Sequence, residues 1–379
     1  MFTNIPSEIS NIKFEDEDIN ILLGVNGSGK STLLNNILRH YSFSNRNAIA
    51  IANTIHDKFN VKNHNIKTLK QNRGRSIVRN IFIESLLNFS NKETTHYKDV
   101  ANILEYVSYN PKIGFKISFI LKNLRNSEIL SLLTEEEKEL LNFISHRYIY
   151  SRQLNDIIWI DFSQKNFYDI VDSYFLQIFK FYRKFKKIKL LREINFYLEK
   201  DGTKIPLYGA SSGELTVISN LIYISSVIKE QTIILIDEPE NSLHPKWQSD
   251  YTKKLVELFY LYLPKIIIAT HSPVIISGSE SNFPNTKTFK SNNGIFELQI
   301  KEPLNVEEIL FRYFNVTTPE NRFLSEHLVR YLNLLSASKI NLESFNNAIE
   351  KIISESYDQK QIKVLMEIKE IGKQITNIQ

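Results

Sequence analysis

Short apolar runs alternate with longer amphipathic stretches along most of the chain. The runs 231–236 and 265–269 end in the unbroken apolar stretches 233–236 and 266–269, which are typical of strands buried on both faces of a parallel sheet. Asp201 and Gly202 separate two further strand-like runs and predict a tight hairpin. Because helical patterns lie between the runs, the chain is expected to form an α/β fold. The other strands are expected at 20–24, 48–53, 157–162, 189–198 and 204–207.

Helix breakers are rare in the first half of the chain. Between residues 32 and 201 the only glycines and prolines are Gly74, Pro111 and Gly114, which favours long helices. The sheet is therefore expected to be interrupted by a helix-rich block. Within it, helices are expected at 99–109, at 121–133 and, after a capping box at Thr134, as far as about residue 146.

A glycine-rich loop follows the first predicted strand. Residues 24–31 read Gly-Val-Asn-Gly-Ser-Gly-Lys-Ser, the full phosphate-loop pattern, and a predicted helix follows. The glycines let backbone N–H groups converge on a phosphate, and the helix N-terminus adds partial positive charge. Lys30 would reach the β- and γ-phosphates of a nucleotide, and the Ser31 hydroxyl would bind Mg²⁺; the motif alone does not say which nucleotide. The residues expected to bind the nucleotide here are Asn26, Gly27, Ser28, Gly29, Lys30, Ser31 and Thr32.

Two buried runs in the second half end in polar side chains. Asp237 and Glu238 end the first, and a carboxylate beside a phosphate loop suits Mg²⁺. Asp237 is therefore the predicted metal ligand, and Glu238 is the predicted general base that polarises the attacking water. His271 ends the second run and would contact the γ-phosphate or order that water. The predicted catalytic residues are Glu238, His271 and Lys30.

These segments resemble the ATP-binding-cassette (ABC) ATPases of the SMC and RecF branch. The resemblance implies an ABC-ATPase head with the P-loop NTPase fold, Mg²⁺-dependent ATP hydrolysis and a homodimer that closes around the nucleotide. In that dimer Ser211, Gly213 and Glu214 would bind the ATP held by the other copy. The matching segments are 24–32 with the Walker A motif, 210–214 with the signature, 233–238 with the Walker B motif, 240–245 with the D-loop and 269–273 with the switch-histidine segment.

The resemblance also implies a division of the chain. The head is expected at residues 1–80 and 155–300, with a helical insertion at 81–154 and a helical C-terminal region at 301–379. The insertion is too short for an SMC coiled coil, and a chain without cysteine has no zinc hook.

Several positions depart from the consensus of transporter ATPases. Ala210, Ser212 and His244 replace the usual Leu, Gly and Asp. No clear Q-loop glutamine follows the second predicted strand, and Asn53 or Gln71 are the candidates to replace it. The long insertion and the missing glutamine count against a transporter.

A narrower resemblance is to bacterial anti-phage ATPases of the Septu and retron-associated type. It rests on residues 57–59, on the signature at 211–214, on the run 237–245 and on the segment 306–316. Related nucleases carry a C-terminal domain with clustered acids, whereas the region after His271 has no obvious Asp-x-Asp cluster. The resemblance therefore implies control of a separate effector, such as an HNH-type nuclease or retron components. A RecF-like DNA-repair ATPase is the alternative.

The charge of the chain is mild, but it is locally concentrated. The net charge is +5, from 47 basic and 42 acidic side chains. Residues 58–83 and 180–192 each contain seven basic residues and no acid. A nucleic-acid backbone surface and ordinary solvated helix faces explain this pattern equally well. Binding of duplex DNA with a steep salt dependence, lost on neutralising Lys184, Lys186 and Lys187, would favour the repair function.

Composition excludes other classes of protein. The absence of cysteine excludes disulfide frameworks, thiolate metal sites and cysteine nucleophiles. The first ten residues have no basic-then-apolar leader pattern, and the apolar stretch 215–228 is too short to span a bilayer. A cytoplasmic protein without a membrane partner is therefore expected.

Overall fold

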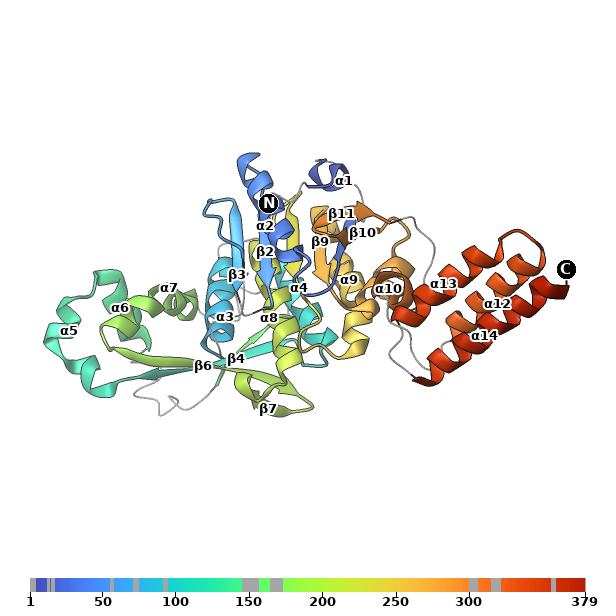
Figure 1. Cartoon of the computed structure of the whole chain (residues 1–379). Helices are drawn as coiled ribbons and strands as arrows, with labels where there is room; N and C mark the ends of the chain where they lie inside the picture. The colour runs from blue at the N-terminus through green and yellow to red at the C-terminus, as the bar shows by residue number, and fades with distance from the viewer. Residues whose placement is uncertain are drawn as a thin grey trace.

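Figure 1 shows three parts in a row, with a mixed sheet and its helices at the centre of the molecule. A smaller sheet with helices lies at one end, and a helical bundle with the C-terminus lies at the other. The structure is a computed structural model. It describes residues 5–11, 14, 18–54, 58–70, 75–90, 95–144, 157–163, 173–299, 306–314, 322–355 and 359–378.

The central sheet has the strand order β11-β10-β1-β9-β8-β2-β3. All neighbouring strands run parallel except β10 and β11, which are antiparallel. The expected α/β fold is confirmed. The strands are β1 (Ile19–Leu23), β2 (Ala48–Ala52), β3 (Ile66–Lys70), β8 (Ile233–Asp237), β9 (Lys265–Thr270), β10 (Lys287–Asn292) and β11 (Ile295–Leu298).

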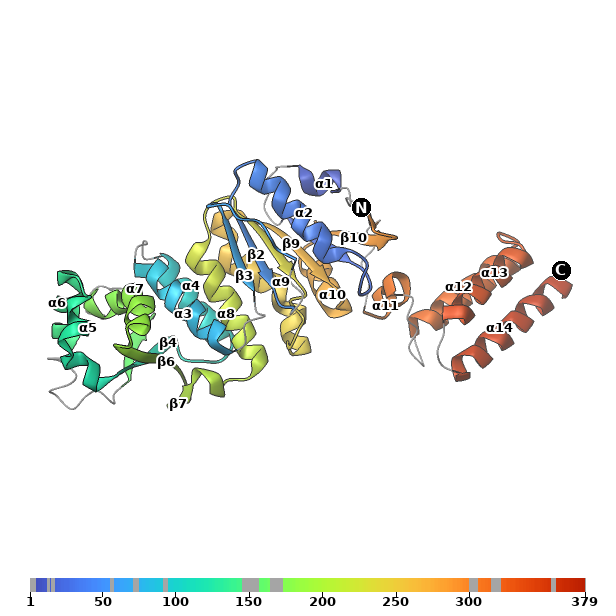
Figure 2. The ribbon, with the colours of Figure 1, turned by 60° about the vertical axis from the view of Figure 1, so that its left-hand side comes forward.

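Helices cover both faces of this sheet, which explains why its inner strands are apolar at nearly every position (Figure 2). On one face, Leu22, Leu235 and Ile267 pack with side chains of α2 (Lys30–Phe43). On the other face, the alternate strand residues Ile21 and Ile236 pack with α8 (Ser212–Val227) and α9 (Pro245–Phe259). A further helix, α10 (Pro273–Asn282), packs against α9.

The second sheet is antiparallel, with the order β5-β4-β6-β7. The predicted hairpin at Asp201 and Gly202 is present, and both residues have positive φ. The strands are β4 (Lys112–Phe119), β5 (Ile158–Asp161), β6 (Leu191–Lys200) and β7 (Thr203–Pro206).

The segment 81–154 is not purely helical, contrary to expectation, because β4 lies within it. Ile113, Phe115 and Ile117 are buried on one side of this strand. That alternation has the period of two expected of a strand, and the sequence prediction overlooked it. The boundaries of the predicted domains stay a prediction.

One predicted helix of the insertion is also corrected. Residues 121–133 form a 3₁₀ turn (Leu121–Arg125) and a short helix, α5 (Ser127–Ser131), in place of one long helix. The break lies at Asn126, whose side chain accepts hydrogen bonds from the N–H groups of Glu128 and Ile129 and so caps α5. The other helices between β3 and β6 are α3 (Arg75–Ser90), α4 (Thr95–Tyr106), α6 (Glu135–Ile144) and α7 (Ser173–Lys187).

The predicted capping box at Thr134 is confirmed. The Thr134 N–H donates to Glu137 Oε2 (2.8 Å), and the Glu137 N–H donates to Thr134 Oγ1 (3.4 Å). This pair fixes the start of α6.

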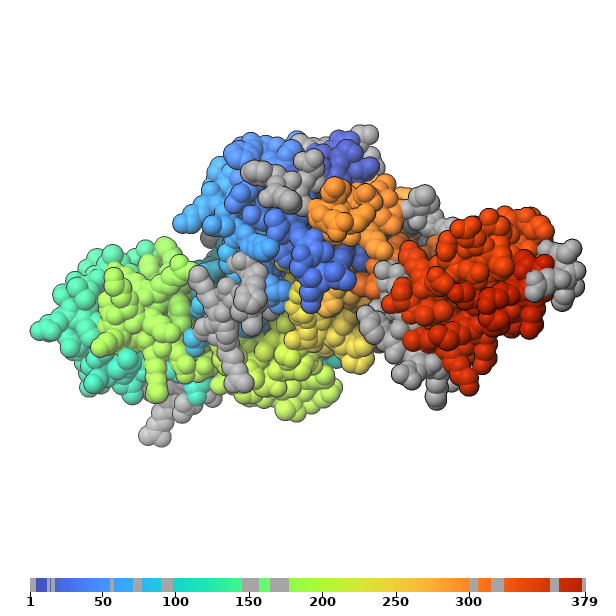
Figure 3. Space-filling view, viewed as in Figure 1, coloured from blue at the N-terminus to red at the C-terminus, as the bar shows by residue number. Residues whose placement is uncertain are grey.

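The C-terminal helices have a core of their own. Leu328, Phe345 and Leu365 are buried together between α12 (Arg322–Ser336), α13 (Leu342–Glu355) and α14 (Gln359–Ile378). Figure 3 shows this bundle projecting from one end of the molecule. A separate helix, α11 (Val306–Phe314), packs against α10 of the head. In the part of the chain that the structure describes, no helix has both the length and the apolar character needed to cross a membrane.

Candidate nucleotide-binding site

The phosphate loop joins β1 to α2 in the conformation that its glycines allow. Gly27 and Gly29 have φ values of +84° and +94°, a region that side chains with a Cβ avoid. Lys30 is 5% exposed, and its Nζ donates to the Gly24 and Val25 carbonyls (2.7 and 3.2 Å). Its ammonium group therefore lies along the inside of the loop. Burial lowers the pKa of Lys30, while nearby Glu238 and Asp237 raise it.

A second cation lies beside the same loop. Lys58, from the first basic stretch, donates from Nζ to Thr32 Oγ1 (2.8 Å). Sequence reasoning did not assign Lys58 to the nucleotide, because it lies 26 residues further along the chain.

Asp237 lies at the carboxyl end of β8 and is 1% exposed. Its carboxylate is hydrogen-bonded to the Ser31 side chain. Burial raises the pKa of Asp237 to about 6, although the Ser31 hydrogen bond and the Lys30 charge oppose that change. Its Oδ1 is buried and has no hydrogen-bond partner among the described residues. The structure thus brings together the two side chains predicted to bind the metal.

The residues present fit Mg²⁺. No group of three or more His, Cys, Asp or Glu side chains in the described residues is arranged to hold a metal ion. A phosphate-loop Mg²⁺ does not need such a cage, because it takes one Ser or Thr hydroxyl, one carboxylate contact, and otherwise phosphate and water oxygens. The unpaired Asp237 Oδ1 next to the Ser31 hydroxyl is a donor set of that kind.

Glu238 is held in a strained backbone conformation. Its φ is +50°, in the left-handed region, and its N–H donates to the Ala269 carbonyl (2.9 Å). Its Oε2 accepts a hydrogen bond from Asn241 Nδ2 (3.2 Å), and its Oε1 lies 3.7 Å from His271 Nδ1. Glu238 therefore contacts Asn241 and His271, whereas Asp237 contacts Ser31.

Glu240 positions His271, a role that the sequence analysis did not assign. Glu240 is 7% exposed, and its Oε1 accepts from the Thr270 hydroxyl (2.8 Å) and the His271 N–H (2.7 Å). His271 Nδ1 lies 3.0 Å from the same oxygen. Burial raises the pKa of Glu240, and its partners at 270 and 271 oppose this. The signal that could have identified it is a third acid directly after the strand that ends in Asp237 and Glu238.

Asn53 links the signature helix to the catalytic edge. It follows β2, and its N–H donates to the Asp237 carbonyl (3.2 Å). Its Oδ1 accepts from Asn220 Nδ2 of α8 (2.9 Å), and its carbonyl accepts from Asn241 Nδ2 (3.3 Å). Of the two Q-loop candidates, Asn53 is therefore at the site, whereas Gln71 lies outside the described residues.

Among the described residues, the side chains of the signature turn form no hydrogen bond with this cluster. Ser211 caps α8, its side chain accepts from the Glu214 N–H, and Glu214 Oε2 accepts from the Ser211 N–H (2.8 Å). Glu214 Oε2 also accepts from the Tyr109 hydroxyl (3.1 Å), and Lys200 Nζ lies 3.8 Å from Glu214 Oε1. Ser211 and its neighbour Ser212 are exposed.

Gly213 is buried beneath the D-loop. A Cβ at this position would lie 2.5 Å from the Ser242 carbonyl oxygen, so only glycine allows this close approach. The signature turn and the D-loop therefore form one surface. The role of Gly213 in that contact is structural, and its predicted phosphate contact stays a prediction. His244, where transporters carry Asp, accepts the Lys246 N–H on Nδ1 (3.3 Å) and so caps α9.

Comparison with known proteins gives the family. Residues 19–277 match the family model described as AAA domain, putative AbiEii toxin, Type IV TA system. Three curated relatives match more distantly. The Retron Vc95 probable ATPase of Vibrio cholerae serotype O1 biovar El Tor is 25% identical over 363 residues, covering 71% of this chain and 69% of the relative. The Retron Ec83 probable ATPase of Escherichia coli is 24% identical over 195 residues, covering 46% and 33%. Protein ea59 of Escherichia phage lambda is 38% identical over 66 residues, covering 17% and 13%.

Among solved structures, the Smc head domain of Pyrococcus furiosus with an extended coiled coil, bound to the C-terminal domain of ScpA, aligns with a TM-score of 0.27 and 11% identity. That alignment covers 75% of this chain and 90% of that chain. The family match covers well over half of the chain, and the relatives confirm the expected kinship with retron-associated ATPases. The chain belongs to the AAA-domain ATPase family described as putative AbiEii toxin, Type IV TA system.

Proposed function

We propose that this protein binds ATP with Mg²⁺, hydrolyses it, and uses the cycle to control a partner effector in anti-phage defence. The observation that carries the ATPase part is the cluster at the carboxyl edge of the sheet. There the phosphate loop with Lys30, the Ser31–Asp237 pair and the Glu238–His271 pair lie together on neighbouring elements.

Each side chain of the cluster has a distinct task in this proposal. Lys30 exchanges its carbonyl contacts at Gly24 and Val25 for β- and γ-phosphate oxygens. Ser31 and Asp237 hold Mg²⁺, which neutralises developing charge on the phosphates. Glu238 orients the attacking water and accepts its proton. Glu240 orients His271, which contacts the γ-phosphate or orders that water.

The second half of the ATP site comes from another copy of the chain. Ser211 and Ser212 are exposed at the N-terminus of a helix of 16 residues, where the partial positive charge of the helix end favours an anion. Within one chain the hydrogen bonds of Ser211 stay in its own turn. A homodimer that traps ATP between the phosphate loop of one copy and the signature turn of the other uses both sites.

The effector is proposed from kinship. Two relatives are named as probable ATPases of retrons, and the described region after His271 is mostly helical. We infer that ATP-driven opening and closing of the dimer restrains or releases a separate protein, such as an HNH-type nuclease or another retron component.

Two variants test the ATPase part. Lys30→Met removes the charge that faces the β- and γ-phosphates, so binding of a fluorescent ATP analogue should be lost. Glu238→Gln keeps the shape of the side chain but not the base, so binding should persist while turnover falls about 10²–10⁴-fold. Wild-type turnover by Glu238→Gln would refute the assignment of the base.

A RecF-like DNA-repair ATPase is the second candidate, and one feature favours it. Basic side chains from both charged stretches line a cleft between α3 and α7. Gel-shift measurements on duplex DNA with a salt titration separate the two functions, because a repair ATPase should bind duplex DNA without any partner. Lys184 is not suited to that test, because its Nζ pairs with the buried carboxylate of Glu137.

A further inference from the structure

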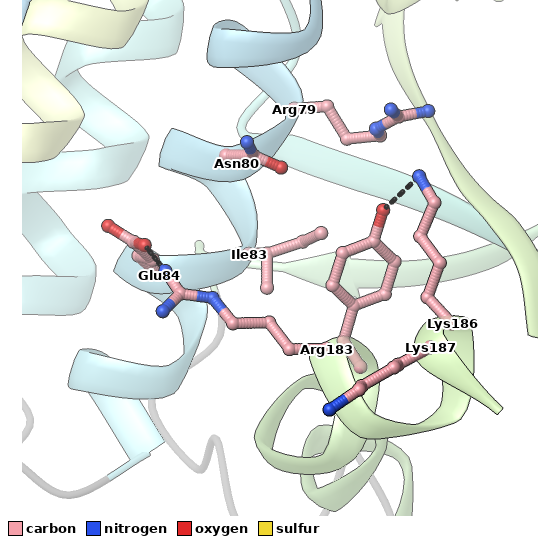
Figure 4. Close-up of a pocket in the computed structure, with 8 residues that line it drawn as sticks. Arg79, Asn80, Ile83, Glu84, Arg183, Lys186 and Lys187 are labelled. Carbon is pink, nitrogen blue, oxygen red and sulfur yellow. Dashed lines mark hydrogen bonds and ion pairs between the residues drawn. The ribbon is translucent and has the colours of Figure 1, made fainter.

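An open cleft of about 490 Å³ lies between α3 and α7, outside the nucleotide site. Figure 4 shows Arg79 and Glu84 on α3 opposite Arg183, Lys186 and Lys187 on α7. Among the described residues that line it, four side chains are cationic and Glu84 is the single acid. The two basic stretches of the sequence thus meet across one cavity.

The cations of the cleft have spare hydrogen-bonding capacity. The Arg79 side chain is 14% exposed, its Nη1 lies 3.5 Å from Glu193, and its Nε has no hydrogen-bond partner among the described residues. Lys186 reaches only the Tyr182 hydroxyl, at 3.4 Å, among hydrogen-bond partners in the described part of the chain. A buried donor nitrogen of a half-buried guanidinium costs free energy unless an anion completes its bonds.

Other cations of the same stretch are used within the protein. Lys180 pairs with Glu136 (2.9 Å) and Lys184 with Glu137 (2.5 Å), both on α6. These two lysines fasten α7 to α6. The basic residues of α7 therefore divide into a structural pair and a cleft-facing set, which is not expected of an evenly solvated helix face.

We propose that this cleft binds the phosphate backbone of a nucleic acid. Guanidinium and ammonium groups from two helices can contact successive phosphates along a strand. Tyr182, the aromatic side chain of the lining, is 6% exposed, so it offers no ring face on which a base could stack. Binding is therefore independent of base sequence and strongly dependent on salt. The inference does not depend on the ATP site.

One acidic side chain of the cleft, Glu84, competes with a phosphate for the cations. Glu84 pairs with Arg183 and occupies one of the cations that a phosphate would use. Removing its charge should increase affinity, whereas neutralising cleft lysines should reduce it. Opposite effects from two substitutions on one cavity cannot be produced by general unfolding.

The test is fluorescence anisotropy of labelled 20-nucleotide single strands and of the matching duplex, over a salt series with the full chain. Lys186→Gln with Lys187→Gln should weaken binding at least 5-fold. It should also reduce the slope of log affinity against log salt by about 1.4 for single strands, from about 0.7 per lost phosphate contact. Glu84→Gln should tighten binding 2-fold or more. The matched control removes two exposed lysines of the C-terminal bundle, Lys351→Gln with Lys363→Gln, and should bind like the wild type.

Three results would overturn the proposal. One is unchanged affinity and salt slope in the Lys186→Gln, Lys187→Gln variant. Another is displacement of the oligonucleotide by poly-glutamate as effectively as by unlabelled oligonucleotide, which would indicate an acidic protein partner. The third is saturable binding of ADP at the cleft with no binding of either oligonucleotide, which would indicate a free nucleotide site. The oligonucleotide that binds more tightly, single strand or duplex, identifies the form of nucleic acid that the cleft binds.

Discussion

Asp237 is the residue on which the pH dependence of the site depends. Its pKa is raised from 3.8 to about 6, mainly by burial. A protonated Asp237 cannot bind Mg²⁺, so affinity for Mg²⁺ and ATP should fall as the pH drops below about 6. Titration of nucleotide binding between pH 5 and 8 measures this. Affinity that stays constant across that range would contradict the assignment of Asp237.

The same carboxylate should destabilise the free protein at neutral pH. Because the folded state holds the proton more tightly than the unfolded state, folding stability falls as pH rises from about 4 through about 6. The cost is at most about 3 kcal/mol. Asp237→Asn should therefore raise the melting temperature at pH 7.5 by a few degrees while abolishing Mg²⁺-dependent ATP binding. A lower melting temperature would show that the charged form is stabilising.

Glu240 should act through His271 and not through the substrate. Glu240→Ala removes the acceptor for the Thr270 hydroxyl and the His271 N–H, so kcat should fall about 10-fold or more with KM for ATP nearly unchanged. Glu240→Gln keeps an oxygen that can accept both bonds, so it should restore most of kcat. Steady-state kinetics of both variants decide this, and an equal loss in the two would mean that the charge itself takes part.

At the scale of elements, α9 and α10 are held close together at a glycine. A Cβ on Gly278 would lie 2.1 Å from the Ser249 carbonyl oxygen, so Gly278→Ala should separate the two helices and destabilise the protein by about 3 kcal/mol. Gly209→Ala is the matched control, because its Cβ would meet nothing nearer than 3.5 Å. Urea unfolding of both variants tests this, and equal stability of the two would contradict it.

The elements that the sequence predicted well are those with unambiguous local signals. The strands around the phosphate loop are apolar at most positions, and the hairpin at Asp201 and Gly202 needs positive φ at two adjacent residues. Strand β4 was missed because its alternating pattern lies among helices and pairs with β6, about 80 residues away. The break at Asn126 was missed because the residues on both sides of it follow a helical pattern, and only the side chain of Asn126 caps a new helix there.

At the scale of the molecule, the grouping of Lys30, Asp237 and His271 was predictable. Each lies at or just beyond the carboxyl end of a strand of one parallel sheet, and the carboxyl ends of parallel strands lie on the same edge. The contacts of Asn53 with Asn220 and of Gly213 with Ser242 were not predictable. They join segments whose separation in sequence carries no periodic signal, and only the packing of α8 against the sheet brings them together.

The two basic stretches of the sequence could be assigned to one surface only from the structure. Arg79 and Lys187 are about 100 residues apart, yet they line one cavity because α7 packs against α3. Sequence alone could not separate these cations from Lys180 and Lys184, which serve the contact with α6.

The central claim is that two copies hold each nucleotide jointly, and the mass of the Glu238→Gln protein in solution tests it most directly. By light scattering, this variant should change from 44.3 kDa to twice that mass on addition of Mg²⁺ and ATP. Ser211→Asp keeps a good helix cap but places a negative charge where the γ-phosphate bound by the other copy would lie. The double variant Glu238→Gln, Ser211→Asp should therefore have the monomer mass with ATP still bound. A Glu238→Gln protein that stays monomeric while saturated with ATP, or a dimer that Ser211→Asp leaves intact, would contradict the account.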